Sequence, residues 1–210
     1  MPSFIPAPPP FLTGTFGAVI KSISPITNRK ALLDIAVSGP VAGFVVSVAA
    51  TVIGLKLSIA IPLQQPYTLY GYGFSSSIIF HILSYLVFGP EIEQRCILLH
   101  LIAVAGWIGL FVTSANLLPV GQNDGGHIAY AVFGKKHYLI SITILILLIV
   151  LGIFTWPGYI IWAILFFILG IKHPPLDDDL IVLDRKRKIT GCLNLVIFAL
   201  TFMPAPIRFY

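Results

Sequence analysis

Long apolar runs constrain this chain more than any other feature. Residues 34–55 (DIAVSGPVAGFVVSVAATVIGL) contain one ionisable side chain, at their first position. A helix that crosses a bilayer needs about 20 mostly apolar residues, and residues 97–118 and 139–155 are similar runs. Shorter apolar runs follow at residues 160–171 and 189–203, and the run at residues 77–89 is interpreted as half-buried or re-entrant because it is too short to span. The sequence therefore predicts an all-α fold of multi-pass transmembrane helices, about five in number.

The charged residues support this prediction and indicate an orientation. Only 10% of the residues are charged and 57% are hydrophobic, whereas soluble domains are about 25% charged. The net charge is +5, but the Lys and Arg residues do not alternate with aromatic residues in any polar segment. We therefore expect no nucleic-acid partner. In membrane proteins Lys and Arg collect on the cytoplasmic side. If the first span leaves the cytoplasm, ten basic residues lie inside and three outside, which predicts a cytoplasmic N-terminus and an external C-terminus. The inside set is Lys21, Arg29, Lys30, Lys135, Lys136, Lys172 and residues 185–188, and the outside set is Lys56, Arg95 and Arg208.

The chain divides into two parts by composition. Residues 1–33 form a Pro/Gly-rich and then basic N-terminal segment, and residues 34–210 form the transmembrane core. Weak alternation in FLTGTFGAVI predicts a short strand or a re-entrant loop near residues 11–22. Inside the first span, Gly39 and Gly43 have the spacing at which small residues let two helices pack closely.

Asp124 lies in a Gly-rich turn that closes the second long run, in the stretch NLLPVGQNDGGHIAY (residues 116–130). Pro119 cannot continue a helix, and the glycines permit backbone conformations that other residues resist. An ionisable residue at membrane depth is costly and marks a functional site. The other interpretation is that Asp124 caps the helix that follows. The residues alone leave both interpretations open.

This stretch resembles the segment that carries the third metal ligand in the site-2-type intramembrane zinc metalloproteases. The segment FIPAPPP…GTFGAVIKSISPITNRKALLDIAVSGPVAGF is similar to the part that follows the family's H-E-x-x-H helix, and HPPLDDD…LDRKRKITG is similar to its last loop. The resemblance implies that Asp124 is the zinc carboxylate ligand and that Asn116 helps to hold the substrate. It also implies that zinc is the cofactor and that the reaction is the hydrolysis of peptide bonds within the membrane. The family has an apolar residue before the aspartate, where this chain has Asn123.

The H-E-x-x-H motif itself is missing, because no histidine in the sequence is followed by glutamate. That motif works because residues i and i+4 share one helix face, so that both rings reach one metal. No two histidines here have that spacing. We expect His127 to be a hydrogen-bonded structural residue rather than a ligand, His81 to lie in the core, His100 at an interface, and His137 and His173 in loops.

The resulting prediction is a membrane protein of the site-2-type zinc metalloprotease family, with no catalytic residue of its own in this chain. Two explanations for the missing motif compete, a truncated form and a protease-like protein without activity, and the intact Asp124 turn favours truncation. The alternatives are a non-catalytic scaffold that binds membrane helices and a small transporter. The partners expected are transmembrane protein or peptide substrates and the lipid bilayer. The location expected is a prokaryotic cell membrane.

Overall fold

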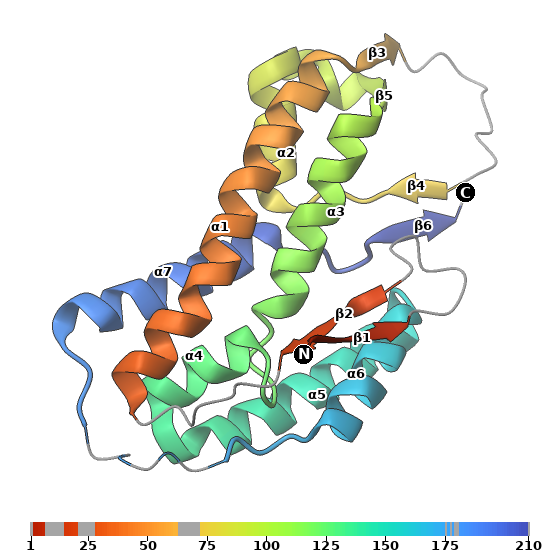
Figure 1. Cartoon of the computed structure of the whole chain (residues 1–210). Helices are drawn as coiled ribbons and strands as arrows, with labels where there is room; N and C mark the ends of the chain where they lie inside the picture. Colours follow the sequence, from red (N-terminus) through yellow and green to blue (C-terminus); the bar gives the residue numbers. More distant parts are fainter. Residues whose placement is uncertain are drawn as a thin grey trace.

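The computed structural model describes residues 2–6, 15–20, 28–62, 72–174, 176, 178 and 181–209. Helices dominate this part of the chain (Figure 1). They are α1 (Arg29–Lys56), α2 (Ile78–Phe88), α3 (Leu101–Asn116), α4 (Asp124–Phe133), α5 (His137–Phe154), α6 (Gly158–Leu169) and α7 (Arg185–Thr201), with short 3-10 turns η1 (Pro90–Gln94) and η2 (Gly134–Lys136). The helical fold that the sequence predicts is confirmed.

Two stretches of helix are long and apolar enough to cross a membrane, α1 and the continuous stretch Asp124–Phe154 that joins α4 to α5. Helices α2, α3 and α6 are apolar but shorter. Large apolar side chains cover the outside of the described bundle, as with Phe154 (80% exposed) and Leu86 (73% exposed). A soluble protein would bury most such side chains, whereas lipid solvates them. The membrane location therefore holds, and the number of five crossings stays a prediction.

Several helices begin earlier or later than their apolar runs. Helix α1 begins at Arg29, five residues before the predicted span, because the Asn28 side chain accepts hydrogen bonds from the Lys30 and Ala31 amides. The predicted span 97–118 instead opens in a strand, and its helix begins after His100, whose ring caps it. Capping side chains decide these boundaries, and hydropathy does not register them.

Helices α1 and α3 lie side by side (Figure 1) and are held together by small residues. A side chain added at Gly106 would bring its Cβ to 2.6 Å from the Thr51 backbone nitrogen, which no Cβ tolerates. The same close approach repeats along the pair: Gly54 faces Ala103, Gly109 faces Ser47, and Gly43 faces Thr113. The packing role expected for Gly43 is confirmed. Gly39 differs, because it faces Asp124.

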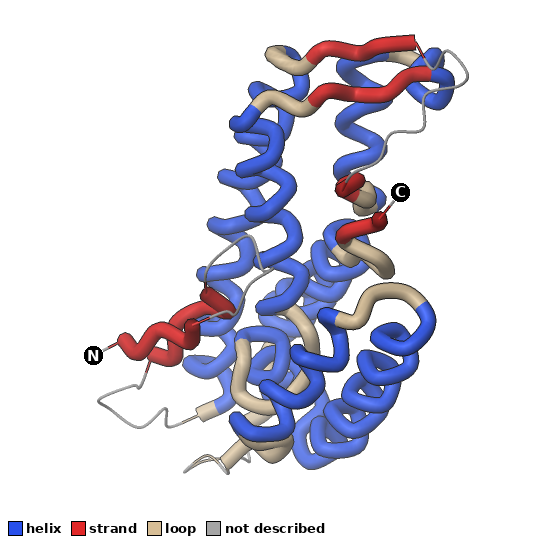
Figure 2. The backbone as a smooth tube through the Cα atoms, turned by 90° about the vertical axis from the view of Figure 1, so that its right-hand side faces the viewer, coloured by secondary structure: helices blue, strands red, loops and turns tan. Residues whose placement is uncertain are grey.

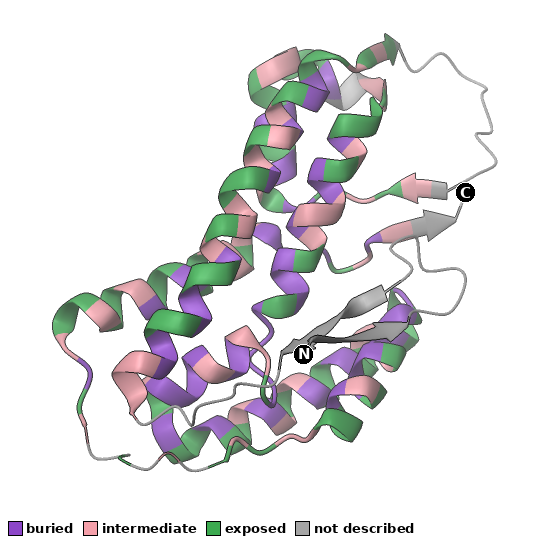
Figure 3. Ribbon diagram, viewed as in Figure 1, coloured by how far each residue is buried: buried purple, intermediate pink, exposed green. Residues whose placement is uncertain are grey.

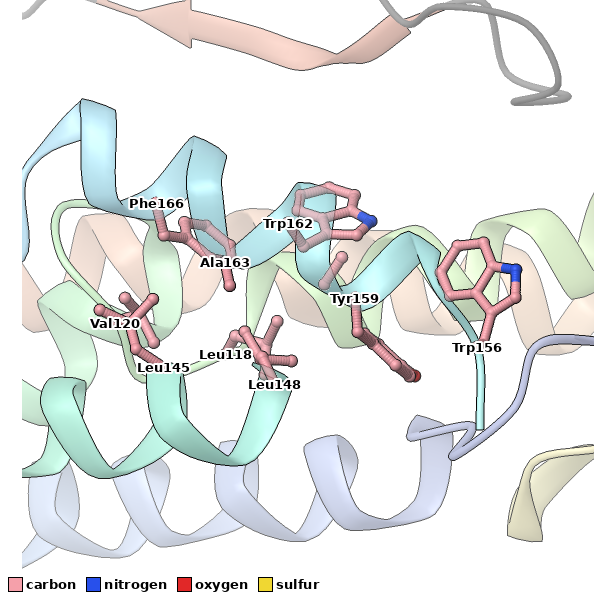
Figure 4. Packing of buried hydrophobic residues seen from close by; sticks show 10 residues of the cluster. Leu118, Val120, Leu145, Leu148, Trp156, Tyr159, Trp162, Ala163 and Phe166 are labelled. Carbon is pink, nitrogen blue, oxygen red and sulfur yellow. The ribbon is translucent and has the colours of Figure 1, made fainter. Parts of the chain in front are cut away.

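Helices α5 and α6 form a hairpin that turns at Trp156 and Pro157. Figure 4 shows its core, in which Leu118 and Val120, from the turn between α3 and α4, lie among the side chains of the hairpin. Buried residues run along the inner faces of the helices, and exposed residues cover the outer faces (Figure 3). The turn before Asp124 is therefore anchored in this core on its apolar side.

The strands form three separate antiparallel pairs (Figure 2). The pair β1 (Pro2–Pro6) and β2 (Thr15–Ile20) confirms the strand predicted near residues 11–22. The pairs β3 (Ile59–Pro62) with β5 (Arg95–Leu98), and β4 (Tyr72–Phe74) with β6 (Ile207–Phe209), were not predicted. Strands of three or four residues leave no readable alternation in a chain that is apolar throughout.

Candidate metal-ligand turn

The turn between α3 and α4 packs tightly enough to require its glycines. Gly121 has φ +60°, in the left-handed region, and any side chain there would strike the Gly170 carbonyl. A Cβ at Gly126 would lie 2.7 Å from the Val120 carbonyl oxygen. Because the backbone of the turn lies directly against the first turn of α4, the Gly-rich sequence is a requirement of close packing.

Asn123, and not Asp124, caps α4. Its Oδ1 accepts a hydrogen bond from the Gly126 amide at 2.9 Å, and its Nδ2 donates to the Ala115 carbonyl at 3.2 Å. One amide side chain thus satisfies an unpaired donor at the start of α4. It also adds a second donor to the Ala115 carbonyl near the end of α3, which already accepts from the Leu118 amide. Asp124 is the first residue inside the helix. The interpretation of Asp124 as the helix cap is therefore wrong.

The Asp124 carboxylate is half-buried and makes no hydrogen bond or ion pair with any described residue. Its Oδ2 lies 3.5 Å from the position that a Cβ of Gly39 would take. The missing side chain at Gly39 leaves open space on that side of the carboxylate. The positive end of the α4 dipole favours a negative charge at this position, but a half-buried carboxylate normally also has a direct partner.

Asn116, the other predicted site residue, is exposed at the last position of α3. It takes no part in the hydrogen bonds that hold the Asp124 turn, which come from Asn123. In the described ranges no group of three or more His, Cys, Asp or Glu side chains could hold a metal ion. A catalytic zinc takes three protein ligands and keeps one position open for water. The described side chains therefore do not complete a zinc site.

The histidines are arranged differently from the sequence-based expectation. His81 is exposed on α2, so the prediction that it lies in the core is wrong. His137 opens α5 and is 1% exposed, so its placement in a loop is also wrong. His173 does lie in a loop, and its Nε2 lies 2.8 Å from Nδ1 of His127. Hydropathy gives no signal for this pair, because 46 positions and a helical hairpin separate its members.

A second polar cluster ties the start of α7 to α1. The Arg187 guanidinium donates to both Asp34 oxygens, at 3.0 Å and 2.6 Å, and to Asp184 Oδ1 at 2.8 Å. These bonds raise the pKa of Arg187, chiefly through Asp34. The hydrogen bond from Arg187 holds the pKa of Asp184 below its ordinary value. These contacts hold the N-terminal parts of α1 and α7 together at the same end of the bundle.

These features define a helical membrane protein with a Gly-rich turn between two inner helices, and the carboxylate in that turn has no partner among the described residues. The sequence model of Peptidase family M50 matches residues 3–154. The chain therefore belongs to peptidase family M50, the site-2-type metalloproteases, as the sequence predicts. No solved structure matches the chain.

Several plant proteins are similar to this chain. The chain is 30% identical in sequence to the "Probable zinc metalloprotease EGY1, chloroplastic" of Arabidopsis thaliana over 97% of its length. The chain is 28% identical to the "Probable zinc metalloprotease EGY2, chloroplastic" of the same plant over its whole length. The chain spans 37% of the length of each of these relatives. The chloroplastic location of the relatives conflicts with the expectation of a prokaryotic cell membrane.

A third relative does not bear the name of a protease. The "DDT domain-containing protein PTM" of Arabidopsis thaliana is 33% identical over 59% of this chain, which corresponds to 7% of its own length. A region similar to part of this chain therefore also occurs within a much larger protein that is not named as a protease.

Proposed function

We propose that this chain forms part of the core of a membrane-embedded zinc metalloprotease and that Asp124 is a carboxylate ligand of its zinc. The observation that carries the proposal is the half-buried Asp124 carboxylate, which has no hydrogen-bond or ion-pair partner among the described residues. A cation would compensate that charge, and the open space beside Gly39 gives it room. Membership of the M50 family and similarity to proteins named zinc metalloproteases support zinc as the cation.

The substrates proposed are membrane-spanning protein or peptide segments that reach the turn between α3 and α4. Asn116 is suited to contact them, because its amide is exposed at the end of α3, next to this turn. The amide can donate and accept hydrogen bonds to an extended peptide backbone. Such contacts would hold a substrate segment beside Asp124 without supplying a catalytic group.

The 210-residue chain is proposed to be inactive alone, because one carboxylate does not make a catalytic zinc site. The two remaining ligands would come from a helix that bears H-E-x-x-H. To test the proposal, such a helix is joined upstream of the chain, and zinc content, cleavage of a transmembrane substrate and thermal unfolding are measured for wild type and Asp124→Asn. Asn has nearly the same shape as Asp and is a weaker zinc ligand.

We expect Asp124→Asn to insert and unfold as wild type does while it loses zinc and cleavage. Asn123→Ala is the matched control at the next position: it should lose stability through the lost cap, by about 1 kcal/mol, and retain zinc under conditions in which it is folded. Full zinc content and full cleavage in Asp124→Asn would contradict the proposal.

The alternative is a non-catalytic scaffold that binds membrane helices in the same place. Two observations favour it: the incomplete ligand set of the described residues, and the similarity to PTM, whose name designates no protease. A scaffold would bind a transmembrane segment equally well with or without zinc. Binding that is unchanged in Asp124→Asn, together with no cleavage after the H-E-x-x-H helix is added, would favour the scaffold.

The proposed topology has five crossings, with α1, α3, α5, α6 and α7 as the spans and the N-terminus in the cytoplasm. The basic residues support it, because the elements that carry them meet at one end of the bundle. Arg29 at the start of α1 lies against Gly134, next to the lysines of η2. Arg187 at the start of α7 binds Asp34 of α1.

A further inference from the structure

Three histidines and a tyrosine gather beside the Asp124 turn, and the proposed function uses none of them. His127 and Tyr130 come from α4, His137 from the start of α5, and His173 from the chain that follows α6. The His173 ring stacks on Tyr130, with ring centroids 4.1 Å apart, and meets His127 edge-on at 5.0 Å. His137 lies 6.2 Å from His173.

Hydrogen-bond partners fix the roles of three of the four ring nitrogens in the His127–His173 pair. Nδ1 of His173 lies 2.6 Å from the Pro174 carbonyl oxygen, which can only accept, so this nitrogen carries the proton. In the neutral ring the other nitrogen, Nε2, is then bare and accepts. Nδ1 of His127, 2.8 Å away, must therefore be the donor. The pair is complete when both rings are neutral.

The pair fastens residues 170–174 to the helix that begins with Asp124. The same segment touches the turn at a second point, where the Gly170 carbonyl lies against Gly121. At a third point the Lys172 ammonium lies 5.1 Å above the Tyr138 ring. Only the histidine contact, among these three, involves groups that titrate near neutral pH.

We propose that His127 and His173 form a proton-sensitive latch that holds residues 170–174 against the Asp124 turn and releases them in acid. One added proton keeps an N–H···N contact. Two protons place N–H against N–H and put two positive charges side by side, which breaks the contact. Release therefore requires both rings to be charged and occurs below the ordinary histidine pKa of about 6.5.

The described charged groups around the pair favour release once the rings are protonated. The His137 ring on α5 lies 6.2 Å from His173, and the basic residue Lys172 precedes His173 in the chain, so both oppose two positive charges on the pair. Asp124 lies one helical turn from His127 and is the single carboxylate of α4. Release of the segment removes the Gly170 carbonyl from Gly121 and so loosens the turn that positions Asp124.

The latch can be tested in the chain as it exists, without zinc or substrate. Amide hydrogen exchange is followed at Gly170 and Gly121, whose N–H groups donate to the Phe166 carbonyl and the Ser141 hydroxyl. The measurements are made in detergent with EDTA at about pH 7.5 and about pH 3.5, because the second proton of the pair is added well below the ordinary histidine pKa, and they are corrected for the intrinsic pH dependence of exchange. The variants are His173→Gln, whose amide accepts from His127 but does not titrate, and His127→Phe, which cannot donate. His81→Gln is the control, because His81 is exposed on α2.

In wild type and His81→Gln, exchange should become about fivefold faster at the lower pH, the factor carried by one net hydrogen bond. In His173→Gln it should stay slow at both pH values, and in His127→Phe it should be fast at both. Equal corrected exchange of wild type at the two pH values would overturn the proposal, as would an acid response that persists in His173→Gln. Protection that appears only when zinc replaces EDTA would also overturn it, since the pair would then be a metal site. None of these results bears on Asp124 as a zinc ligand.

Discussion

The contact between α1 and α3 permits a quantitative test at Gly109. A Cβ added there would lie 3.0 Å from the Ser47 Cβ and closer still to the Ser47 Oγ. Carbon atoms pack at about 3.5–4.0 Å, so the two helices would have to separate or the serine would have to move. The Ser47 rotamer is held by its 2.6 Å hydrogen bond to the Gly43 carbonyl. Rotation of the hydroxyl therefore sacrifices that bond and leaves the Cβ contact in place.

The expected change in the free energy of unfolding caused by Gly109→Ala is the sum of two opposing effects. Overpacking costs about 1–3 kcal/mol, and replacing Gly by Ala inside a helix returns about 1 kcal/mol. The net effect is a loss of up to about 2 kcal/mol. The atoms that collide belong to the Ser47 side chain, and its Cα lies at an ordinary 3.7 Å. Adding Ser47→Gly should therefore rescue the variant, apart from about 0.5 kcal/mol of lost helix propensity.

Gly106 provides the contrast within the same helix pair. Its added Cβ would lie 2.6 Å from the Thr51 nitrogen and 2.8 Å from the Thr51 Cα, which are backbone atoms. Gly106→Ala should cost more than Gly109→Ala, and Thr51→Gly should rescue it less. Gly43→Ala, where the contact is 3.3 Å to the Thr113 hydroxyl, should be nearly neutral.

The measurement is equilibrium unfolding in mixed micelles for the two single variants and the double variant at each position, read as a double-mutant cycle. A coupling energy of about 1–2 kcal/mol is expected between positions 47 and 109. The reasoning is refuted if Gly109→Ala is more stable than wild type by the full helix-propensity gain of about 1 kcal/mol, or if Ser47→Gly gives no more rescue at position 109 than Thr51→Gly gives at position 106.

Three further predictions concern the ends of the bundle. Asn123→Ala should lower the free energy of unfolding by about 1 kcal/mol in thermal melts, and a change near zero would show that the cap is dispensable. Arg187→Ala should speed amide exchange in the first turn of α7. In wild type the Arg187–Asp184 contact should weaken as the pH falls through the lowered pKa of Asp184. Because that pKa is depressed, the contact is fully present above the ordinary value of about 3.9. Reporters fused after Lys136 and after Tyr210 should lie on opposite sides of the membrane, and the same side for both would refute the five-span topology.

Features that depend on neighbouring residues could be predicted from the sequence. The long runs gave α1 and α5, Pro119 marked the end of α3, and the glycines around Asp124 marked the turn. Each of these rests on local chemistry, since hydropathy sets a span and proline or glycine interrupts it. The choice between Asn123 and Asp124 as the cap could not be made, because both residues cap helices equally well and the choice depends on where the Ala115 carbonyl lies.

Contacts between residues that are far apart in the sequence could not be predicted. The His127–His173 pair forms only because the α5–α6 hairpin brings residue 173 back to α4. The Arg187–Asp34 ion pair joins residues 153 positions apart. Each member alone reads as an ordinary loop or surface residue, so no local pattern distinguishes it. The position of the two N-termini was nevertheless indicated by the basic residues, because membrane insertion sorts Lys and Arg by side regardless of their contacts.

Gly39 and Gly43 illustrate the limit of a sequence pattern. The two glycines lie four residues apart on one face of α1 and have the same spacing signature, which predicts a helix contact for both. Gly43 meets the Thr113 side chain of α3 in that way, but Gly39 lies beyond the end of α3 and faces the Asp124 carboxylate. Packing requires a small residue at Gly43, because the helices touch there. At Gly39 an added Cβ would only reach ordinary contact, at 3.5 Å, so helix packing does not account for the glycine. The Asp124 Oδ2 is the neighbour of this position within 4 Å, so Gly39 borders the proposed metal ligand rather than a helix contact.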